Sequence, residues 1–84
     1  MRYPIFIERD TATKVFGVVL PDLPGCRSAG GTLEEAVDAL KQAAAAWIET
    51  ALGQGRPLPR PSSIEQARRL SGYEDWAVGI IDLG

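Results

Sequence analysis

Carboxylates are the side chains in this sequence that could support hydrolytic or metal chemistry. The 84-residue chain has eleven acidic residues and no histidine, so a general base or a metal ligand would have to come from aspartate or glutamate. The candidates are Asp10, Asp22, Glu35 and Asp82. Each has a structural interpretation as a turn residue, a helix cap or a group that flanks an element. We therefore predict no catalytic residue, no metal site and no cofactor, and a protein that is not an enzyme.

Cys26 is the only cysteine, so it cannot form a disulfide within the chain. A zinc site built from nitrogen and sulfur ligands is excluded by the lack of histidine. Without a histidine partner the thiol is also a poor nucleophile. We predict that Cys26 is a small apolar packing residue.

Gly30-Gly31-Thr32 precedes an expected helix, where free backbone N–H groups could bind an anion. The segment lacks the spacing of a nucleotide-binding glycine loop. We interpret it as a tight turn into a capped helix.

The charge balance is mildly acidic, with nine basic residues against eleven acidic ones and a net charge of -2. The arginines of the last third are offset one for one by acidic residues; they are Arg56, Arg60, Arg68 and Arg69, against Glu65, Glu74, Asp75 and Asp82. We therefore expect no direct contact of this segment with nucleic acid, whereas a basic protein partner suits the acidity. No apolar stretch approaches the roughly 20 residues of a membrane-spanning helix, so we expect a cytoplasmic protein that does not bind membranes.

Two β-rich segments, Tyr3 to Glu8 and Val15 to Leu20, flank a polar stretch and predict an antiparallel hairpin. Both sides of the first segment carry apolar groups, so it should be largely covered. Pro21 to Cys26 forces a turn, in which Gly25 can take a positive φ. Residues 26–29 form an expected short strand, and Trp76 to Leu83 is the last strand.

Thr32 and Glu35 have the spacing of a capping box, in which Thr32 accepts from the backbone of Glu35 and Glu35 reaches back to that of Thr32. A helix of about 20 residues follows, because apolar residues recur at helical spacing. They are Leu33, Ala36, Val37, Leu40, Ala44, Trp47, Ile48 and Ala51. Glycines and prolines end it, and Ser63 with Gln66 caps a short helix that ends near Leu70.

These elements predict one α+β domain over residues 1–84, a small antiparallel sheet with one long amphipathic helix packed on it and a second short helix. The Pro-Asp-Leu-Pro-Gly-Cys loop at residues 21–26, followed by Thr-Leu-Glu-Glu-Ala at 32–36, closely resembles the HicB family of antitoxins. The resemblance covers residues 3–61. It implies a degenerate ribonuclease H-like fold of order β-β-β-α-α-β that binds and masks a messenger-RNA-cleaving HicA-type toxin. We find no DNA-binding domain of the kind many HicB proteins carry within these 84 residues.

No motif assigns the residues that contact the toxin, so we predict them from expected exposure. A rigid loop and an aromatic, acidic turn suit a basic partner; the predicted contacts are Asp22, Leu23, Pro24, Tyr73, Glu74, Asp75 and Trp76. We assign structural roles to Gly25, Cys26, Gly31, Thr32, Glu35 and Trp47. The last strand is a candidate free sheet edge, from which we expect a homodimer or higher homo-oligomer. The alternatives are a stand-alone RNA- or small-molecule-binding domain and a metal-dependent nuclease.

Overall fold

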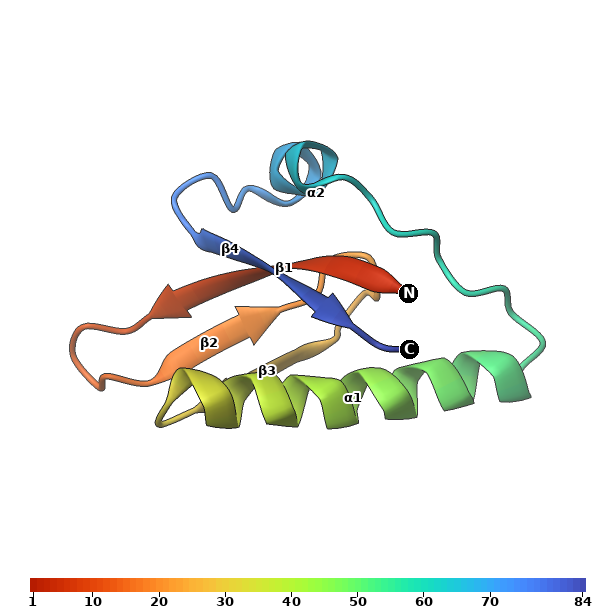
Figure 1. Cartoon of the computed structure of the whole chain (residues 1–84), viewed down its shortest axis with the longest axis horizontal. Coiled ribbons are helices and arrows are strands. Elements are labelled where there is room, and N and C mark those ends of the chain that lie inside the picture. Colours follow the sequence, from red (N-terminus) through yellow and green to blue (C-terminus); the bar gives the residue numbers. More distant parts are fainter.

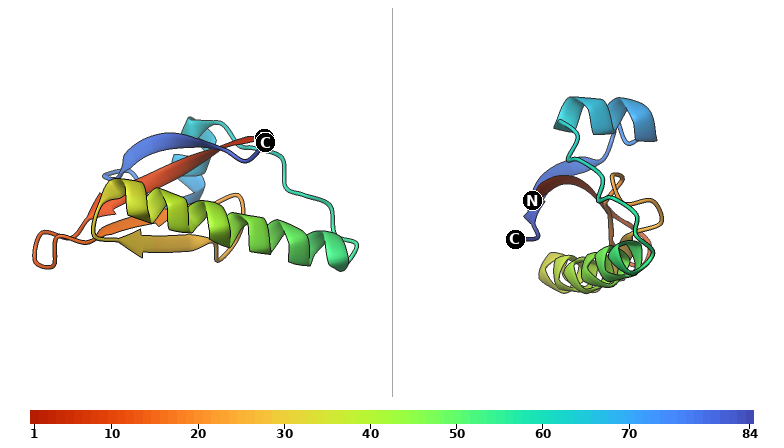
Figure 2. Two further views of the ribbon diagram at one scale, coloured as in Figure 1. Left: turned by 60° about the horizontal axis from the view of Figure 1, so that its bottom comes forward. Right: turned by 90° about the vertical axis from the view of Figure 1, so that its right-hand side faces the viewer.

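The computed structural model describes residues 1–84, apart from the side chains of residues 70 and 71. The elements follow the predicted order, as β1 (Arg2–Arg9), β2 (Phe16–Val19), β3 (Arg27–Gly30), α1 (Leu33–Gly53), α2 (Ile64–Ser71) and β4 (Ala77–Asp82). The fold is α+β, with a four-stranded antiparallel sheet between the long helix and the short one (Figures 1 and 2). The predicted fold class is confirmed.

β1 is one of the two inner strands of the sheet, whose order is β3-β2-β1-β4. Successive side chains of a strand point to opposite faces, so the two apolar sides of β1 serve two layers. Tyr3 and Ile5 are buried in the core that contains residues of α1, while Phe6 is buried in a smaller cluster with Ala67 of α2. The expectation that the first strand is largely covered is confirmed.

α1 packs against the sheet through a face that includes small residues. Ala36 and Ala44 are fully buried on this face, and so is Leu40 between them. Alanines on the contact face let the helix axis approach the strands closely. The predicted apolar face is correct except at its start, since Leu33 remains 40% exposed. Leu33 is the first residue of α1, and the buried part of the face begins three residues later, at Ala36.

Both helix starts are capped by side chains, as predicted. Thr32 accepts a hydrogen bond from the backbone N–H of Glu35 at 3.1 Å. The return contact differs from the prediction, because the Glu35 carboxylate accepts from the N–H of Gly31 at 3.2 Å, one residue beyond Thr32. Ser63 and Gln66 form the complete reciprocal box at the start of α2.

The start of α1 crosses directly over the end of β3. A Cβ atom on Gly30 would lie 2.6 Å from the backbone nitrogen of Ala36, closer than real contacts allow. The hydroxyl of Ser28 donates to the carbonyl oxygen of Ala36 at 2.6 Å, which joins the same two elements. Gly30 therefore permits a close approach, in addition to preceding the turn.

Among the described residues, no helix has both the length and the apolar character needed to cross a membrane.

Candidate partner-binding surface

The loop between β2 and β3 is a compact turn closed by its own backbone. Leu20 donates to the carbonyl of Cys26 at 3.0 Å, and Cys26 donates to that of Leu23 at 2.9 Å. Gly25 takes the predicted left-handed conformation, with φ of 82°. The internal bonds hold the loop in one shape, which favours its use as a preformed surface.

Leu23 was predicted to contact a partner, and the structure corrects this prediction. Its side chain is 0% exposed and belongs to the core beneath α1. The turn directs this leucine inward, where burial removes its apolar surface from water. The neighbouring Pro24 is exposed, so the loop presents Pro24 and not Leu23 to solvent.

Asp22 fastens the loop to a distant segment of the chain. Its carboxylate accepts from the backbone N–H of Ser62 at 2.8 Å and from the Ser62 hydroxyl at 2.6 Å. Ser62 lies in the strap, residues 54–63, which runs from the end of α1 to α2 (Figure 1). Both carboxylate oxygens of Asp22 therefore have partners within the chain.

Tyr3 holds the same strap from the sheet. Its hydroxyl donates to the carbonyl oxygen of Pro59 at 2.7 Å, and the residue is fully buried. Burial raises the pKa of the Tyr3 hydroxyl, and the negative charge of Asp22 raises it further. Tyr3 and Asp22 thus anchor the strap at two points.

Trp47 ties α1 to the exposed side of the loop. The indole N–H donates to the carbonyl oxygen of Pro24 at 3.0 Å, and the half-buried ring packs against the main core. The guanidinium of Arg56 lies 5.8 Å from the centre of the indole ring. Trp47 therefore positions the loop in addition to packing.

The turn from α2 into β4 carries the second predicted segment, Tyr73 to Trp76. Gly72 ends α2 with a left-handed φ of 69°, and Trp76 donates to the carbonyl of Tyr73 at 3.1 Å. The Tyr73 ring stacks on Phe6 with centres 5.3 Å apart and contacts Trp76 at 4.7 Å. Glu74 and Asp75 are exposed. The aromatic pair is thus half-buried, and the acidic pair faces solvent.

Arg68 of α2 holds this turn in place. Its guanidinium donates to the carbonyl oxygens of Glu74 at 2.9 Å and Trp76 at 3.2 Å, and lies 5.5 Å from the centre of the Phe6 ring. Arg68 therefore stabilises the α2–β4 turn through hydrogen bonds within the chain.

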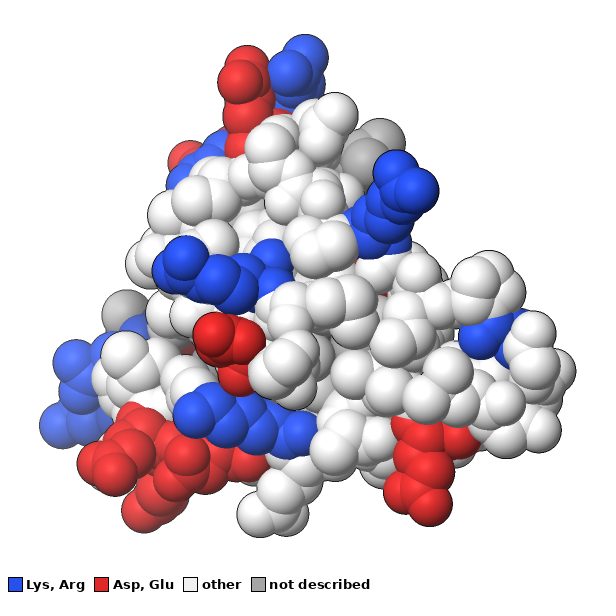
Figure 3. All heavy atoms as spheres, turned by 45° about the vertical axis from the view of Figure 1, so that its right-hand side comes forward, with Lys and Arg blue, Asp and Glu red and all other residues white. Residues whose placement is uncertain are grey.

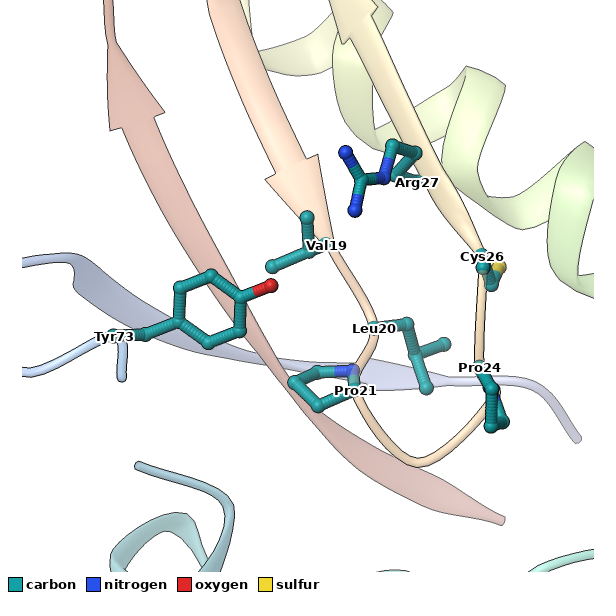
Figure 4. Close-up of a pocket in the computed structure, with 8 residues that line it drawn as sticks. Val19, Leu20, Pro21, Pro24, Cys26, Arg27 and Tyr73 are labelled. Carbon is teal, nitrogen blue, oxygen red and sulfur yellow. The ribbon is translucent and has the colours of Figure 1, made fainter. Parts of the chain in front are cut away.

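A pocket of about 230 Å³ brings the two predicted segments together. In Figure 4 the Tyr73 ring lies beside Val19 and Pro21, while Arg27 extends from β3 toward the same space. Pro24 and Gly25 complete the lining from the loop. Residues about 50 positions apart in the sequence therefore share one hollow.

The four carboxylates singled out from the sequence have structural partners in separate places. Asp10 accepts from the backbone N–H groups of Thr13 and Ala12 in the β1–β2 turn, and these bonds lower the pKa of Asp10. Asp82 accepts from the N–H of Gly84 at 2.9 Å. Within the described part of the chain, no three histidine, cysteine or acidic side chains come together as a metal site.

Cys26 is buried in the main core, at 6% exposure. The burial raises the pKa of the Cys26 thiol, which keeps it protonated and unreactive at neutral pH.

Charges of both signs are interspersed on the surface. On the face seen in Figure 3, acidic and basic side chains lie next to one another among uncharged groups. Arg69 pairs with Glu65 one turn away at 3.1 Å. This distribution matches the balanced charge of the sequence.

The comparison that decides the family is a match to residues 3–84, almost the whole domain described above. The matching family is described as the HicB_like antitoxin of bacterial toxin-antitoxin system. The chain belongs to this family.

Relatives of the HicB-like chain include phage and bacterial proteins. An uncharacterized 14.9 kDa protein from the rep-hol intergenic region of Haemophilus phage HP1 is 40% identical over 83 residues, which are 99% of this chain and 61% of that protein. The chain thus spans about three-fifths of this relative's length. The N-terminal domain of antitoxin HicB from Burkholderia pseudomallei superimposes with a TM-score of 0.84 at 26% identity, covering 100% of this chain and 99% of that one.

A chain of the HicA3 and HicB3 toxin-antitoxin complex is also similar to this HicB-like domain. Its TM-score is 0.72 at 30% identity, and the likeness covers 98% of this chain and 96% of that chain. This chain is therefore similar in fold to a protein whose structure was solved in a toxin-antitoxin complex.

Sequence reasoning missed three residues that shape the surface of this HicB-like domain. Arg68 binds carbonyl groups of the α2–β4 turn, Ser62 binds Asp22 from outside the recognised loop, and Arg27 enters the pocket from the strand next to that loop. Only Arg68 had a sequence signal, its place in the last turn of a capped helix where cations are favoured. The contacts of Ser62 and Arg27 depend on tertiary structure.

Proposed function

We propose that this HicB-like chain is an antitoxin that binds a HicA-type toxin and covers its RNA-cleaving surface, without catalysing a reaction itself. The observation that carries the proposal is the family match over residues 3–84, together with the likeness to a chain of the HicA3 and HicB3 complex. The chain inhibits by occupying the toxin's catalytic surface, so its action needs a preformed contact surface and no reactive group.

The proposed contact surface surrounds the pocket between the loop and the α2–β4 turn. It consists of Pro24, Tyr73, Glu74, Asp75 and Trp76. Asp22 and Leu23 support this surface from within and are not among its contacts. Because the loop is fastened to α1 and the turn to Arg68, little conformational entropy is lost when a partner binds.

Glu74 and Asp75 give the surface its preference for a basic partner. Both are exposed at the tip of the turn, and the adjacent Tyr73 and Trp76 offer aromatic area for contact. Exposed carboxylates accelerate the encounter with a basic protein, and half-buried aromatics supply contact energy. The combination suits a small basic toxin better than a nucleic acid.

Calorimetric titration with the HicA-type toxin encoded beside the gene tests this proposal. We expect a one-to-one complex, and at least about a tenfold loss of affinity in the double variant Glu74→Lys and Asp75→Lys. The matched control is Asp38→Lys with Glu49→Lys, which makes the same charge change at exposed positions of α1. Absence of binding by the unaltered chain would overturn the proposed function, and equal losses in both variants would overturn the assigned surface.

A further inference from the structure

The pocket between the loop and the α2–β4 turn contains a positive charge that its own lining does not match. Arg27 lines this pocket together with Val19 and Tyr73, and no acidic residue is among the described residues of the lining. Val19 and Arg27 face each other across β2 and β3, so their side chains lie on the face of the sheet that α2 covers. The guanidinium therefore lies beside apolar groups, at the edge of the hollow.

Other arginines have partners within the chain. Arg9, Arg56 and Arg68 each lie over an aromatic ring. Arg68 makes the side-chain hydrogen bonds found among the described arginines, and their ion pair belongs to Arg69. Arg27 takes part in none of these contacts, and its side chain is exposed. Arg27 is thus available to bind a group from outside the chain.

The hydroxyl of Tyr73 is a second polar group in the pocket. In Figure 4 this hydroxyl and the guanidinium of Arg27 both extend toward Val19. The Tyr73 ring is held from below, because it stacks on Phe6 with centres 5.3 Å apart. A guanidinium presents its N–H groups as a fork that matches the two oxygens of a carboxylate, and a tyrosine hydroxyl can donate a further bond. The pair suits a carboxylate as its ligand.

The size and surroundings of the pocket favour a single carboxylate on a protein side chain. At about 230 Å³ the pocket is smaller than the roughly 300–1,000 Å³ typical of small-molecule sites. A nucleic acid would bring a row of phosphates to Glu74 and Asp75, which are exposed directly after Tyr73 in the sequence and would repel them. One aspartate or glutamate on an otherwise basic protein surface meets neither obstacle.

We propose that Arg27 determines the specificity of this surface, and that an aspartate or glutamate side chain of the toxin enters the pocket and binds it. This inference rests on the proposed function. A basic toxin that is attracted by Glu74 and Asp75 would otherwise cover Arg27 with positive charge, and a buried charge without a partner strongly destabilises a complex. A HicA-type toxin that lacks the matching carboxylate is therefore rejected, which gives selectivity among such toxins.

Dissociation kinetics of the full chain and the toxin encoded beside its gene test the role of Arg27. Arg27→Gln should raise the dissociation rate at least about thirtyfold, because loss of one partner of a buried, hydrogen-bonded charge pair acts mainly on dissociation. Arg27→Lys should give a smaller rise, since it keeps the charge but not the fork. The matched control is Lys41→Gln at an exposed position of α1, which should leave the dissociation rate unchanged. All three variants should keep the circular dichroism spectrum of the unaltered chain.

The outcomes separate this inference from the proposed function. A normal dissociation rate for Arg27→Gln would overturn the inference and leave the antitoxin function intact. Absence of any complex with the unaltered chain would overturn the proposed function and the inference together.

Charge exchange tests whether the ligand is a side chain of the toxin. Each exposed aspartate and glutamate of the toxin is changed in turn to lysine and titrated with the Arg27→Glu chain. One of these toxin variants should bind Arg27→Glu at least about tenfold more tightly than the unaltered toxin does. If no toxin variant restores binding, the assignment to a toxin carboxylate is wrong. Binding of a single-stranded RNA oligonucleotide by the unaltered chain, lost in Arg27→Gln, would assign the pocket to phosphate and overturn the inference as well.

Discussion

The indole N–H of Trp47 lies 3.0 Å from the carbonyl oxygen of Pro24, so the long helix holds the loop that forms one side of the candidate surface. Trp47→Phe keeps an aromatic ring but removes this donor. We expect the free energy of unfolding to fall by about 1 kcal/mol, and toxin affinity to fall because the loop is less ordered. Denaturant unfolding and calorimetry measure the two effects. Unchanged values in both would contradict the role given to this bond.

Gly30 is predicted to be the most sensitive glycine at the junction of β3 and α1. Gly30→Ala places a methyl group 2.6 Å from the Ala36 nitrogen, so the helix start must shift and stability should fall by roughly 1–3 kcal/mol. Gly53→Ala is the matched control, because nothing lies within 4 Å of its added methyl group. The control should be neutral or slightly stabilising in the same unfolding experiment. Equal stability of the two variants would refute the close approach.

The strap should depend on Asp22. Asp22→Ala removes both bonds to Ser62, and we expect faster hydrogen exchange at the Ser62 amide and a loss of about 1–3 kcal/mol of stability. Exchange rates measured by NMR distinguish a local release of the strap from global unfolding. If Ser62 exchanges at the same rate in both proteins, Asp22 does not anchor the strap.

The helix caps and the contact between Asp22 and Ser62 show which parts of the molecule could be predicted from the sequence. The caps at Thr32 and Ser63 were predictable because their partners lie three residues away. The contact between Asp22 and Ser62 spans 40 residues and has no local pattern. The strand order, with β4 beside β1, likewise depends on tertiary packing.

The candidate surface was predicted in part. Proline and glycine fixed the turn at residues 21–26, but composition alone did not distinguish the inward Leu23 from the outward Pro24. Hydrophobicity favours burial of leucine, whereas the prediction gave more weight to its place in an exposed turn. The pocket shared by Pro24 and Tyr73 required the structure, because α2 and its turn reach the loop only after folding.

Tyr3 should make stability depend on pH in the alkaline range. Because its pKa is raised in the folded protein, its contribution is complete below the ordinary tyrosine pKa of about 10 and is lost as pH rises through the folded value. Tyr3→Phe should lower stability by about 1 kcal/mol at neutral pH by removing the bond to Pro59. The difference between the two proteins should shrink above pH 10 or so. A constant difference across this range would contradict the assignment.

Inhibition of toxin activity tests the central claim most directly. Increasing amounts of this chain are added to an RNA-cleavage reaction run by the HicA-type toxin encoded beside its gene, and intact RNA and complex formation are followed together. We predict that cleavage falls linearly with added chain and stops when the two proteins are present in equal amounts. Undiminished cleavage with no complex at micromolar concentrations would contradict the antitoxin function.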